Sequence, residues 1–271
     1  MHSRCFRVLG PIEVVVADGG HEVRGPHVRG VLAALLLRAN EFLPQHTLVD
    51  ALWDQPPRSA RVNIRTFVMK LRRSLVAVDP ALADRLETRR HQTAASYRLS
   101  VEAGELDLDD FEHAWSSGRT ALVDGRLDTA LSDLDDALSL WRGAAGDDVA
   151  PGGWVAHHLS GLNEQRVTAE EDLLASHIVT GQAAGVIARL RGLVRANPGR
   201  ERAAALLLLA NYRLGDLPEA LNTFTRTRNA LISHFAVEPG PALQRLHVAA
   251  LERDDDILLS NDTVVSTAIG A

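Results

Sequence analysis

The residues whose types and spacing suit a chemical task lie between positions 61 and 73, and the task is recognition of phosphates and bases. Basic side chains recur there at helical intervals, with threonine and methionine between them. No acidic residue occurs from Gln55 to Val78, although a merely solvated surface normally mixes both charges. In a DNA major groove, Arg and Lys donate to guanine, and Thr and Met can contact the thymine methyl group. The pattern favours a DNA-reading helix over its alternative, a solvated basic helix.

The phase of this helix predicts which residues face a ligand. At 100° per residue, its apolar residues Ile64, Val68, Leu71 and Leu75 share one narrow sector, with Phe67 at the border, so this sector is expected to face the core. The predicted base contacts are Arg65, Thr66, Met69, Lys70 and Arg73. The predicted contacts with the DNA backbone or minor groove are His46, Thr47, Arg61, Arg72, Arg89, Arg90, His91 and Tyr97.

The elements that must position these residues can be read along the chain. Residues 6–24 alternate and are broken by Gly-Pro and Asp-Gly-Gly, which predicts strands and turns. Helices are expected from about residue 27 to Asn40, after an N-cap at Thr47, and from Ser59 to Val76. Residues 86–101 have strand-forming ends around a polar centre and predict a β-hairpin. Strands, three helices and a hairpin in this order indicate a winged helix-turn-helix of the α+β class.

Charge is divided unevenly along the chain. Residues 1–101 carry 15 Arg/Lys and 9 Asp/Glu, whereas residues 102–271 carry 14 and 26. A basic first part suits a polyanionic partner, and an acidic second part does not. The acidic run Glu170 to Asp172 is expected to be a solvated helix face.

Several functional classes are disfavoured by what the sequence lacks. There is no Gly-Lys pair for a phosphate-binding loop and no H-E-x-x-H or G-x-S-x-G motif, so no enzyme and no cofactor are expected. His157 and His158, near Asp147 and Asp148, are not expected to bind a metal. The single Cys5 and the lack of a long uncharged apolar run favour a cytoplasmic protein without membrane contact.

The segments "LGPIEV", "LLLRAN", "LVDALWDQPPRSARVNIRTFVMKLRRSL" and "YRL" resemble the Streptomyces antibiotic regulatory proteins over residues 4–101. The resemblance implies an OmpR-like winged helix in residues 1–101. Asp54 and Ser96 stand where the family usually has Gly, and the wing, residues 88–97, is about four residues longer than usual.

The second part of the chain predicts paired helices. Gly125, Gly181 and Gly215 are each followed by small or apolar residues at offsets of 5, 9 and 12, and the last two glycines lie 34 apart. This spacing favours a tetratricopeptide-like all-α domain over generic helical hairpins. The segments "ALSLWRG", "RANPGRERA" and "VEPGPALQRLH" resemble the bacterial transcriptional activation domain of the same family. The expected domain spans residues 106–253, and residues 254–271 are expected to be mostly disordered.

The resemblance implies a transcriptional activator of a secondary-metabolite gene cluster. It implies binding to direct repeats in double-stranded DNA near a promoter's −35 region, with a second protomer side by side, recruitment of RNA polymerase holoenzyme and association with the nucleoid. The alternative is a helical-repeat interaction scaffold or ligand sensor whose winged helix does not bind DNA.

Overall fold

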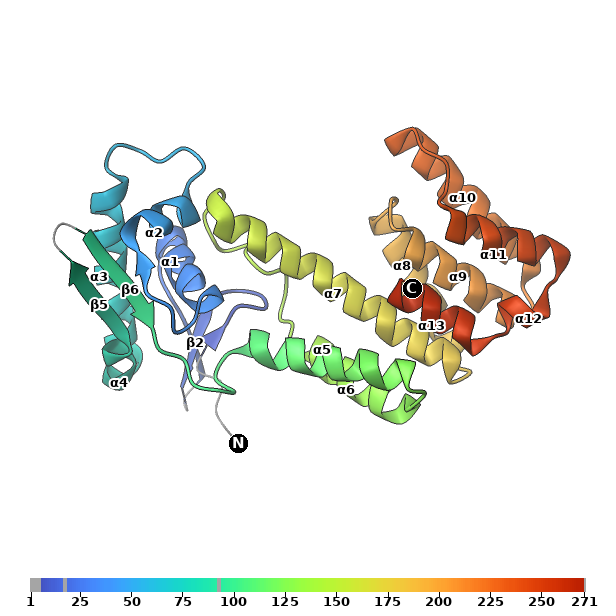
Figure 1. The fold of residues 1–271 in the computed structure, drawn as a ribbon, viewed down its shortest axis with the longest axis horizontal. Coiled ribbons are helices and arrows are strands. Elements are labelled where there is room, and N and C mark those ends of the chain that lie inside the picture. Colours follow the sequence, from blue (N-terminus) through green and yellow to red (C-terminus); the bar gives the residue numbers. More distant parts are fainter. Residues whose placement is uncertain (1–5, 17–18, 92–93, 271) are drawn as a thin grey trace. The chain divides into compact units, whose positions relative to one another are not determined.

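The computed structural model describes residues 6–16, 19–91 and 94–270 (Figure 1). The chain forms two compact units. Unit 1 comprises residues 1–113 and 139–166, and unit 2 comprises residues 114–138 and 167–271. This division differs from the predicted boundary between residues 101 and 106, because residues 139–166 pack with the first part of the chain. In the described ranges, no helix is both long and apolar enough to cross a membrane.

Unit 1 begins with a three-stranded antiparallel sheet. Its strands are β1 (Phe6–Arg7), β2 (Glu13–Val16) and β3 (Gly19–Glu22), in the order β1-β2-β3. Phe6 lies opposite Val14 in the register, and both side chains are fully buried. The strands expected in residues 6–24 are therefore present.

Three helices follow, as the sequence predicts: α1 (Pro26–Leu37), α2 (Gln45–Leu52) and α3 (Ala60–Val78). A short fourth helix, α4 (Pro80–Asp84), was not expected, and its first turn is capped by the Asp79 carboxylate, which accepts from the Ala81 amide at 2.9 Å. The predicted N-cap at Thr47 is wrong. Because the preceding residues form a strand that ends at Pro44, α2 begins directly at the buried Gln45.

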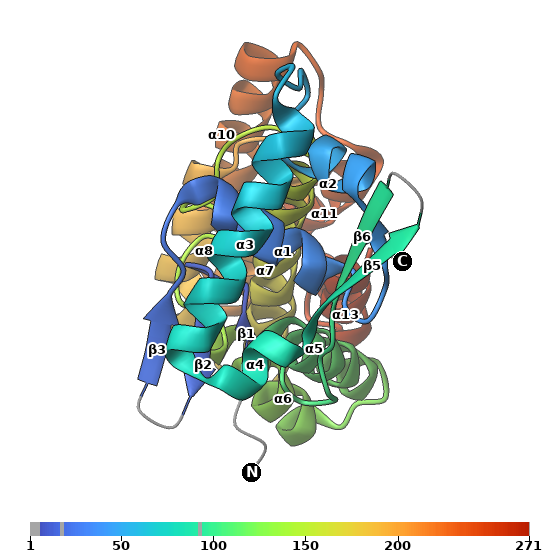
Figure 2. The ribbon, with the colours of Figure 1, turned by 90° about the vertical axis from the view of Figure 1, so that its left-hand side faces the viewer.

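A second antiparallel sheet completes the first part of unit 1. It consists of β4 (Leu43–Pro44), β5 (Leu86–His91) and β6 (Ala94–Leu99), in the order β4-β6-β5. The β5–β6 pair is the predicted hairpin, whereas β4 has two residues, which is too short for an alternation pattern. Figure 2 shows α3 in front of α1, with the hairpin on one side of it and the first sheet on the other.

The rest of unit 1 is joined to β2 and to the segment between β1 and β2 by hydrogen bonds and an ion pair. The Asp107 carboxylate, at the start of α5 (Asp107–Val123), accepts from the amides of Val8 and Leu9 at 2.8 and 3.2 Å. Arg142 pairs with Glu13 at 2.8 Å and donates to the Pro11 carbonyl at 2.9 Å. Burial raises the pKa of Asp107. These bonds explain why residues well beyond 101 belong to unit 1.

Asp54, one of the departures from the family pattern, has a partner in the same unit. Its carboxylate accepts a hydrogen bond from the Gly153 amide at 3.1 Å. Gly153 is the first residue of α7 (Gly153–Val179). A carboxylate at this end of a helix satisfies an amide that lacks an intrahelical partner and complements the helix dipole. Gly153 has a φ of 68°, and a Cβ there would collide with the Ala51 carbonyl oxygen, so the contact requires glycine.

Unit 2 is helical in its described residues. Besides parts of α5 and α7, it contains α6 (Leu127–Ser139), α8 (Ala183–Ala196), α9 (Glu201–Arg213), α10 (Leu217–Phe235), α11 (Pro241–Glu252), α12 (Asp255–Leu258) and α13 (Asn261–Ile269). Gly125, Gly181 and Gly215 each occupy the turn between two helices with φ between 72° and 81°. At the shared offsets the side chains are buried, apart from the half-buried Leu193.

The expectation of disorder in residues 254–271 is wrong for the described residues, which extend to 270. α12 and α13 occupy most of this segment, and Leu258, Val264 and Ala268 are fully buried. Val264 and Ala268 are four residues apart, so they share a face of α13, which packs on α9. The helix α13 has 9 residues, which is too short for its apolar periodicity to predict a helix from the sequence.

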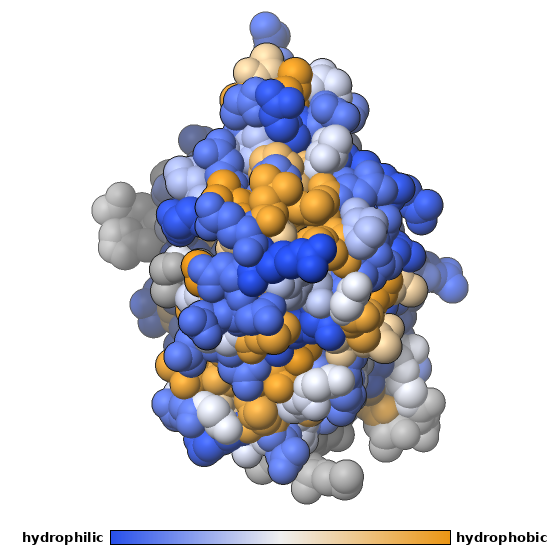
Figure 3. Space-filling model, turned by 90° about the vertical axis from the view of Figure 1, so that its right-hand side faces the viewer, coloured by the Kyte–Doolittle hydropathy of each residue, from blue (hydrophilic) through white to orange (hydrophobic). Residues whose placement is uncertain are grey.

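Apolar side chains are exposed on the face of unit 2 shown in Figure 3. On α11, Val248 and Leu251 are 49% and 59% exposed, and Ile257 and Leu259 follow at 42% and 48%. Acidic residues 254–256 lie between these two pairs. An apolar area of this kind with polar neighbours is typical of a protein contact site.

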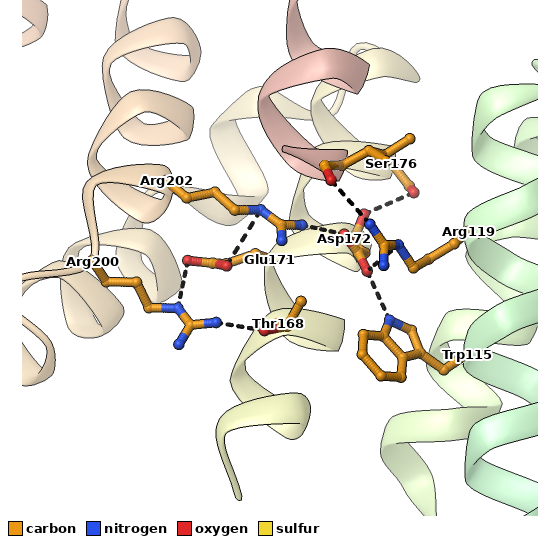
Figure 4. Close-up of polar contacts among 9 residues, drawn as sticks. Trp115, Arg119, Thr168, Glu171, Asp172, Ser176, Arg200 and Arg202 are labelled. Carbon is orange, nitrogen blue, oxygen red and sulfur yellow. Dashed lines mark hydrogen bonds and ion pairs between the residues drawn. The ribbon is translucent and has the colours of Figure 1, made fainter. Parts of the chain in front are cut away.

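A buried ion network connects three helices of unit 2 and corrects another expectation (Figure 4). Glu171 and Asp172, expected on a solvated face, are 0% exposed. Asp172 accepts from the Trp115 indole at 2.7 Å and pairs with Arg119 and Arg202. Glu171 pairs with Arg200 at 3.0 Å and with Arg202 at 3.4 Å. Burial raises the pKa of both carboxyl groups, and the arginines oppose that rise.

Candidate nucleic-acid interface

The two faces of α3 differ as the sequence predicts. Ile64 and Leu71 are fully buried, and Val68 and Leu75 lie on the same face. On the opposite face Met69 is 45% exposed, Thr66 is half-buried, and the basic residues are exposed. These exposed basic residues are Arg61, Arg65, Lys70 and Arg73. We call the face formed by these four residues with Thr66 and Met69 the basic face of α3.

The orientation of α3 is fixed by contacts at its inner side. The Gln45 side-chain amide donates to the Arg61 carbonyl, which ties the first turn of α3 to α2. Phe67 stacks on His27, with ring centroids 5.3 Å apart, and lies 6.2 Å from Trp53. Aromatic pairs at these distances stabilise packing beyond the area they bury. The helix is therefore held on α1 and α2 with its basic face outward.

Arg72 differs from its predicted role as a phosphate contact. It is half-buried, and its Nη2 atom donates to the Leu86 carbonyl at 2.7 Å and to the Thr88 hydroxyl at 3.1 Å. This side chain therefore fixes the distance between α3 and β5. The position of Arg72 beside the basic face does not indicate from the sequence that it binds Leu86, 14 residues away.

Tyr97 contradicts its predicted contact with DNA, because its side chain is in the core. It is 5% exposed and lies between the buried residues Ala95 and Leu99 on the inner side of β6. Strand alternation places residues 95, 97 and 99 on one face, so the burial could have been inferred from the sequence. Burial raises the pKa of Tyr97, whereas the charges of nearby Arg65, Arg90 and Arg72 act to lower it. Positive charges from α3 and β5 therefore act on the Tyr97 hydroxyl.

The two wing arginines lie on opposite faces of the hairpin. Arg90 pairs in register with Ala95 and shares the face of Tyr97, whereas Arg89 pairs with Ser96. The Arg89 guanidinium lies 4.0 Å from the Phe42 ring centroid, and Arg98 lies 4.5 Å from the same ring. Both arginines are thus held by a cation–π contact. The sequence argument did not identify Phe42.

The remaining predicted contacts lie at the start of α2 and the end of β5. His46 is exposed and Thr47 half-buried, both in the first turn of α2, whose amides lack intrahelical acceptors. The Thr47 carbonyl accepts from the Trp154 indole at 3.4 Å. His91 is the last residue of β5, but its side chain and residues 92–93 lie outside the part that the structure describes.

A shallow hollow of about 370 Å³ runs along the outer side of α3 and is lined by Met69, Arg72, Arg73 and Val76. Its lining combines apolar side chains with guanidinium groups. Such a surface can take a methyl group and a hydrogen-bond acceptor side by side, as a thymine next to a guanine presents them. The geometry suits recognition and offers no arrangement of a nucleophile and a base.

Comparison with known proteins identifies the family. The profile of the bacterial transcriptional activator domain matches residues 106–251. The chain is 31% identical to Regulatory protein DnrI of Streptomyces peucetius, over 93% of each chain. It is 33% identical to Regulatory protein AfsR of Streptomyces coelicolor over 97% of this chain, but it spans only 26% of AfsR.

A solved structure is similar to the whole chain. The structure of Mycobacterium tuberculosis EmbR in complex with a low affinity phosphopeptide aligns with a TM-score of 0.86 and 29% identity. The alignment covers 98% of this chain and 69% of the EmbR chain. Two small antiparallel sheets followed by helices are therefore an arrangement that this chain shares with EmbR. With the matched domain and the regulatory relatives, the chain belongs to the Streptomyces antibiotic regulatory protein (SARP) family of transcriptional activators.

Proposed function

We propose that the chain binds DNA in a sequence-specific manner through the basic face of α3. The observation that supports this most is the exposure of four basic side chains and Met69, with the half-buried Thr66 among them, on a helix whose opposite face is buried. In this proposal residues 1–101 form an OmpR-like winged helix, α3 enters the major groove, and the β5–β6 hairpin is the wing.

The contact residues divide into two groups. Arg65, Thr66, Met69, Lys70 and Arg73 meet base edges. Arg61, Arg90, His46 and the first-turn amides of α2 meet phosphates. Arg89 lies on the Phe42 side of the hairpin. We therefore assign it to a phosphate of the DNA backbone further along the duplex than the phosphate that Arg90 contacts. Arg72 and Tyr97 are removed from the proposed contacts and assigned to the support of α3 and β6.

The family suggests how binding leads to activation. We propose that two protomers bind direct repeats side by side near the −35 region of a promoter and recruit RNA polymerase holoenzyme to a secondary-metabolite gene cluster in the nucleoid. The helical unit supplies the polymerase contact. Three of its turns contain a glycine, and the side chains 5, 9 and 12 residues after each glycine are mostly buried. This supports a tetratricopeptide-like arrangement, which suits protein contact.

The experiment is a gel shift on a promoter fragment with direct repeats, against a scrambled fragment of the same composition, at several salt concentrations. We expect preference for the repeats and a slope of log K against log salt of about −4 per protomer, from four to five phosphates. Equal retention of both fragments would overturn sequence-specific binding. Retention of neither fragment would favour the alternative, in which the helical unit acts as a scaffold or ligand sensor without DNA binding.

A further inference from the structure

A groove of about 610 Å³ lies in unit 2, and the proposed DNA contact does not use it. It is formed by α8 and α10, which flank α9 (Figure 1). Its volume is within the range of small-molecule sites in proteins, about 300–1,000 Å³. The groove therefore has room for a ligand rather than only for ordered water.

The rim of the groove is cationic. Arg191 and Arg195 lie four residues apart on α8, and Arg226 faces the same groove from α10. Glu219 is the acidic residue of the lining, and its Oε1 atom pairs with Arg191 at 3.4 Å and with Arg226 at 3.3 Å. Within the described part of the chain, Arg195 pairs with no carboxylate. Because Arg191 and Arg226 share the single carboxylate of Glu219, the rim has an excess of positive charge.

This positive rim contrasts with its surroundings. Residues 114–138 and 167–271 contain 12 arginines and 17 acidic residues, so unit 2 is acidic as a whole. Three of those arginines line one groove with a single carboxylate. The local charge therefore selects for an anionic group.

The floor of the groove is formed by aliphatic side chains and by threonines whose hydroxyls already donate hydrogen bonds within α10. Val194, Leu207 and Ala230 contribute aliphatic side chains. The hydroxyl of Thr223 donates to the Glu219 carbonyl at 2.8 Å, and the hydroxyl of Thr227 donates to the Thr223 carbonyl at 2.9 Å. Because both hydroxyls are satisfied inside α10, the floor offers mainly dispersion contacts and burial to a ligand.

Gly192 contributes to the lining of the groove. Gly192 is in the interior of α8, where glycine is less favourable than alanine by about 1 kcal/mol. A Cβ at this position would meet no atom within 4 Å, although the residue lines the groove. A larger side chain at position 192 would therefore extend into open space next to the other lining residues.

We propose that this groove binds a small amphipathic molecule with an apolar body and one anionic group. The anionic group lies between Arg195 and Arg226, and the apolar body covers Val194 and Leu207. The proposal does not depend on DNA binding.

The test uses two dyes with the same aromatic skeleton, 1-anilinonaphthalene-8-sulfonate and the uncharged N-phenyl-1-naphthylamine, titrated against the full chain by fluorescence. The sulfonate dye should bind one saturable site and be displaced by decanoate but not by decanol. Gly192→Leu should abolish that site. Arg195→Ala should weaken the sulfonate dye about tenfold, as expected for loss of a charged hydrogen bond, and leave the neutral dye unchanged.

Gly185→Leu is the matched control, because Gly185 is also on α8 with no atom within 4 Å of a Cβ but does not line the groove. It should bind both dyes like the unsubstituted chain. Circular dichroism and thermal unfolding identify any variant that fails to fold. The proposal is overturned if Gly192→Leu or Arg195→Ala leaves the affinity for the sulfonate dye within twofold in folded protein, or if decanol competes as well as decanoate.

Discussion

Arg89 and Arg90 are neighbours in the chain, yet strand alternation directs them to opposite faces of the hairpin. Arg90 is on the face of Tyr97, where the charges of Arg65 and Arg72 also act. Arg89 lies on the Phe42 ring instead. At the scale of the residue, a proposed contact therefore depends on the face of the strand as well as on the charge.

Three alanine variants test this difference. Arg73→Ala should weaken binding by about 1–3 kcal/mol and change the base preference at one position, because its exposed guanidinium is assigned to a base edge. Arg90→Ala should weaken binding to all sequences alike and reduce the salt slope by about 1. Arg89→Ala should reduce the salt slope by less than Arg90→Ala, because the Arg89 guanidinium already lies on the Phe42 ring on the other face of the hairpin. Gel shifts over single-base variants at three salt concentrations measure both quantities, and a slope change for Arg89→Ala alone would contradict the assignment.

The sequence predicts burial and exposure correctly where these depend only on the position of a residue within its own helix. Ile64 and Leu71 are buried and Met69 is exposed because one helix period decides all three. The prediction for Tyr97 is wrong because the alternation of β6 places its ring on the buried face, with Ala95 and Leu99. Glu171 and Asp172 could not be placed from the sequence, since their neutralising partners Arg200 and Arg202 lie about 30 residues away.

At the scale of the element, the ion network explains how α5, α7 and the start of α9 are held together within unit 2. Arg202 contacts both Glu171 and Asp172, which are otherwise enclosed by helices. A buried ion pair contributes little over an apolar substitute, but the loss of one partner leaves an uncompensated charge. The network therefore specifies which helices meet, and its weak point is the shared arginine.

Arg202→Met should lower the free energy of unfolding by about 3 kcal/mol near neutral pH. The folded-state pKa of Asp172 is already raised by burial, so its contribution to stability is largest at low pH and falls as the pH rises through that pKa. Removal of the arginine raises the pKa further, and the loss of stability should be greater at pH 8 than at pH 5. Urea unfolding at both values measures this difference.

The control is Arg228→Met, which removes an exposed pair with Glu238 on the same unit. Its unfolding midpoint should change little at either pH, because exposed pairs contribute little. If Arg202→Met behaved like this control, or lost more stability at pH 5, the network would not carry the role assigned to it.

At the scale of the whole molecule, the proposed tasks use separate surfaces. The basic face of α3 belongs to unit 1, and the exposed apolar side chains of α11 belong to unit 2. An activator needs both a DNA contact and a polymerase contact. The two can therefore be impaired independently if Val248 and Leu251 contribute to the second.

The double variant Val248→Asp, Leu251→Asp should bind promoter DNA normally and activate transcription about fivefold less or worse, because charge on an apolar contact opposes its burial. Val123→Asp, at a residue of α5 that is also 59% exposed, is the matched control and should activate normally. Gel shift and in vitro transcription with purified polymerase holoenzyme separate the two effects. Normal activation by the double variant would exclude α11 from the polymerase contact.

The hydrogen bond between Asp54 and Gly153 limits how related proteins can exchange DNA-binding segments by recombination. A recombinant that joins residues 1–101 of one relative to the remainder of another would separate Asp54 from Gly153 and Val8 from Asp107. A foreign side chain at position 153 would also collide with the Ala51 carbonyl. DNA specificity in this lineage should therefore be inherited together with residues 107–113 and 139–166, and a crossover that divides unit 1 should yield less stable hybrids.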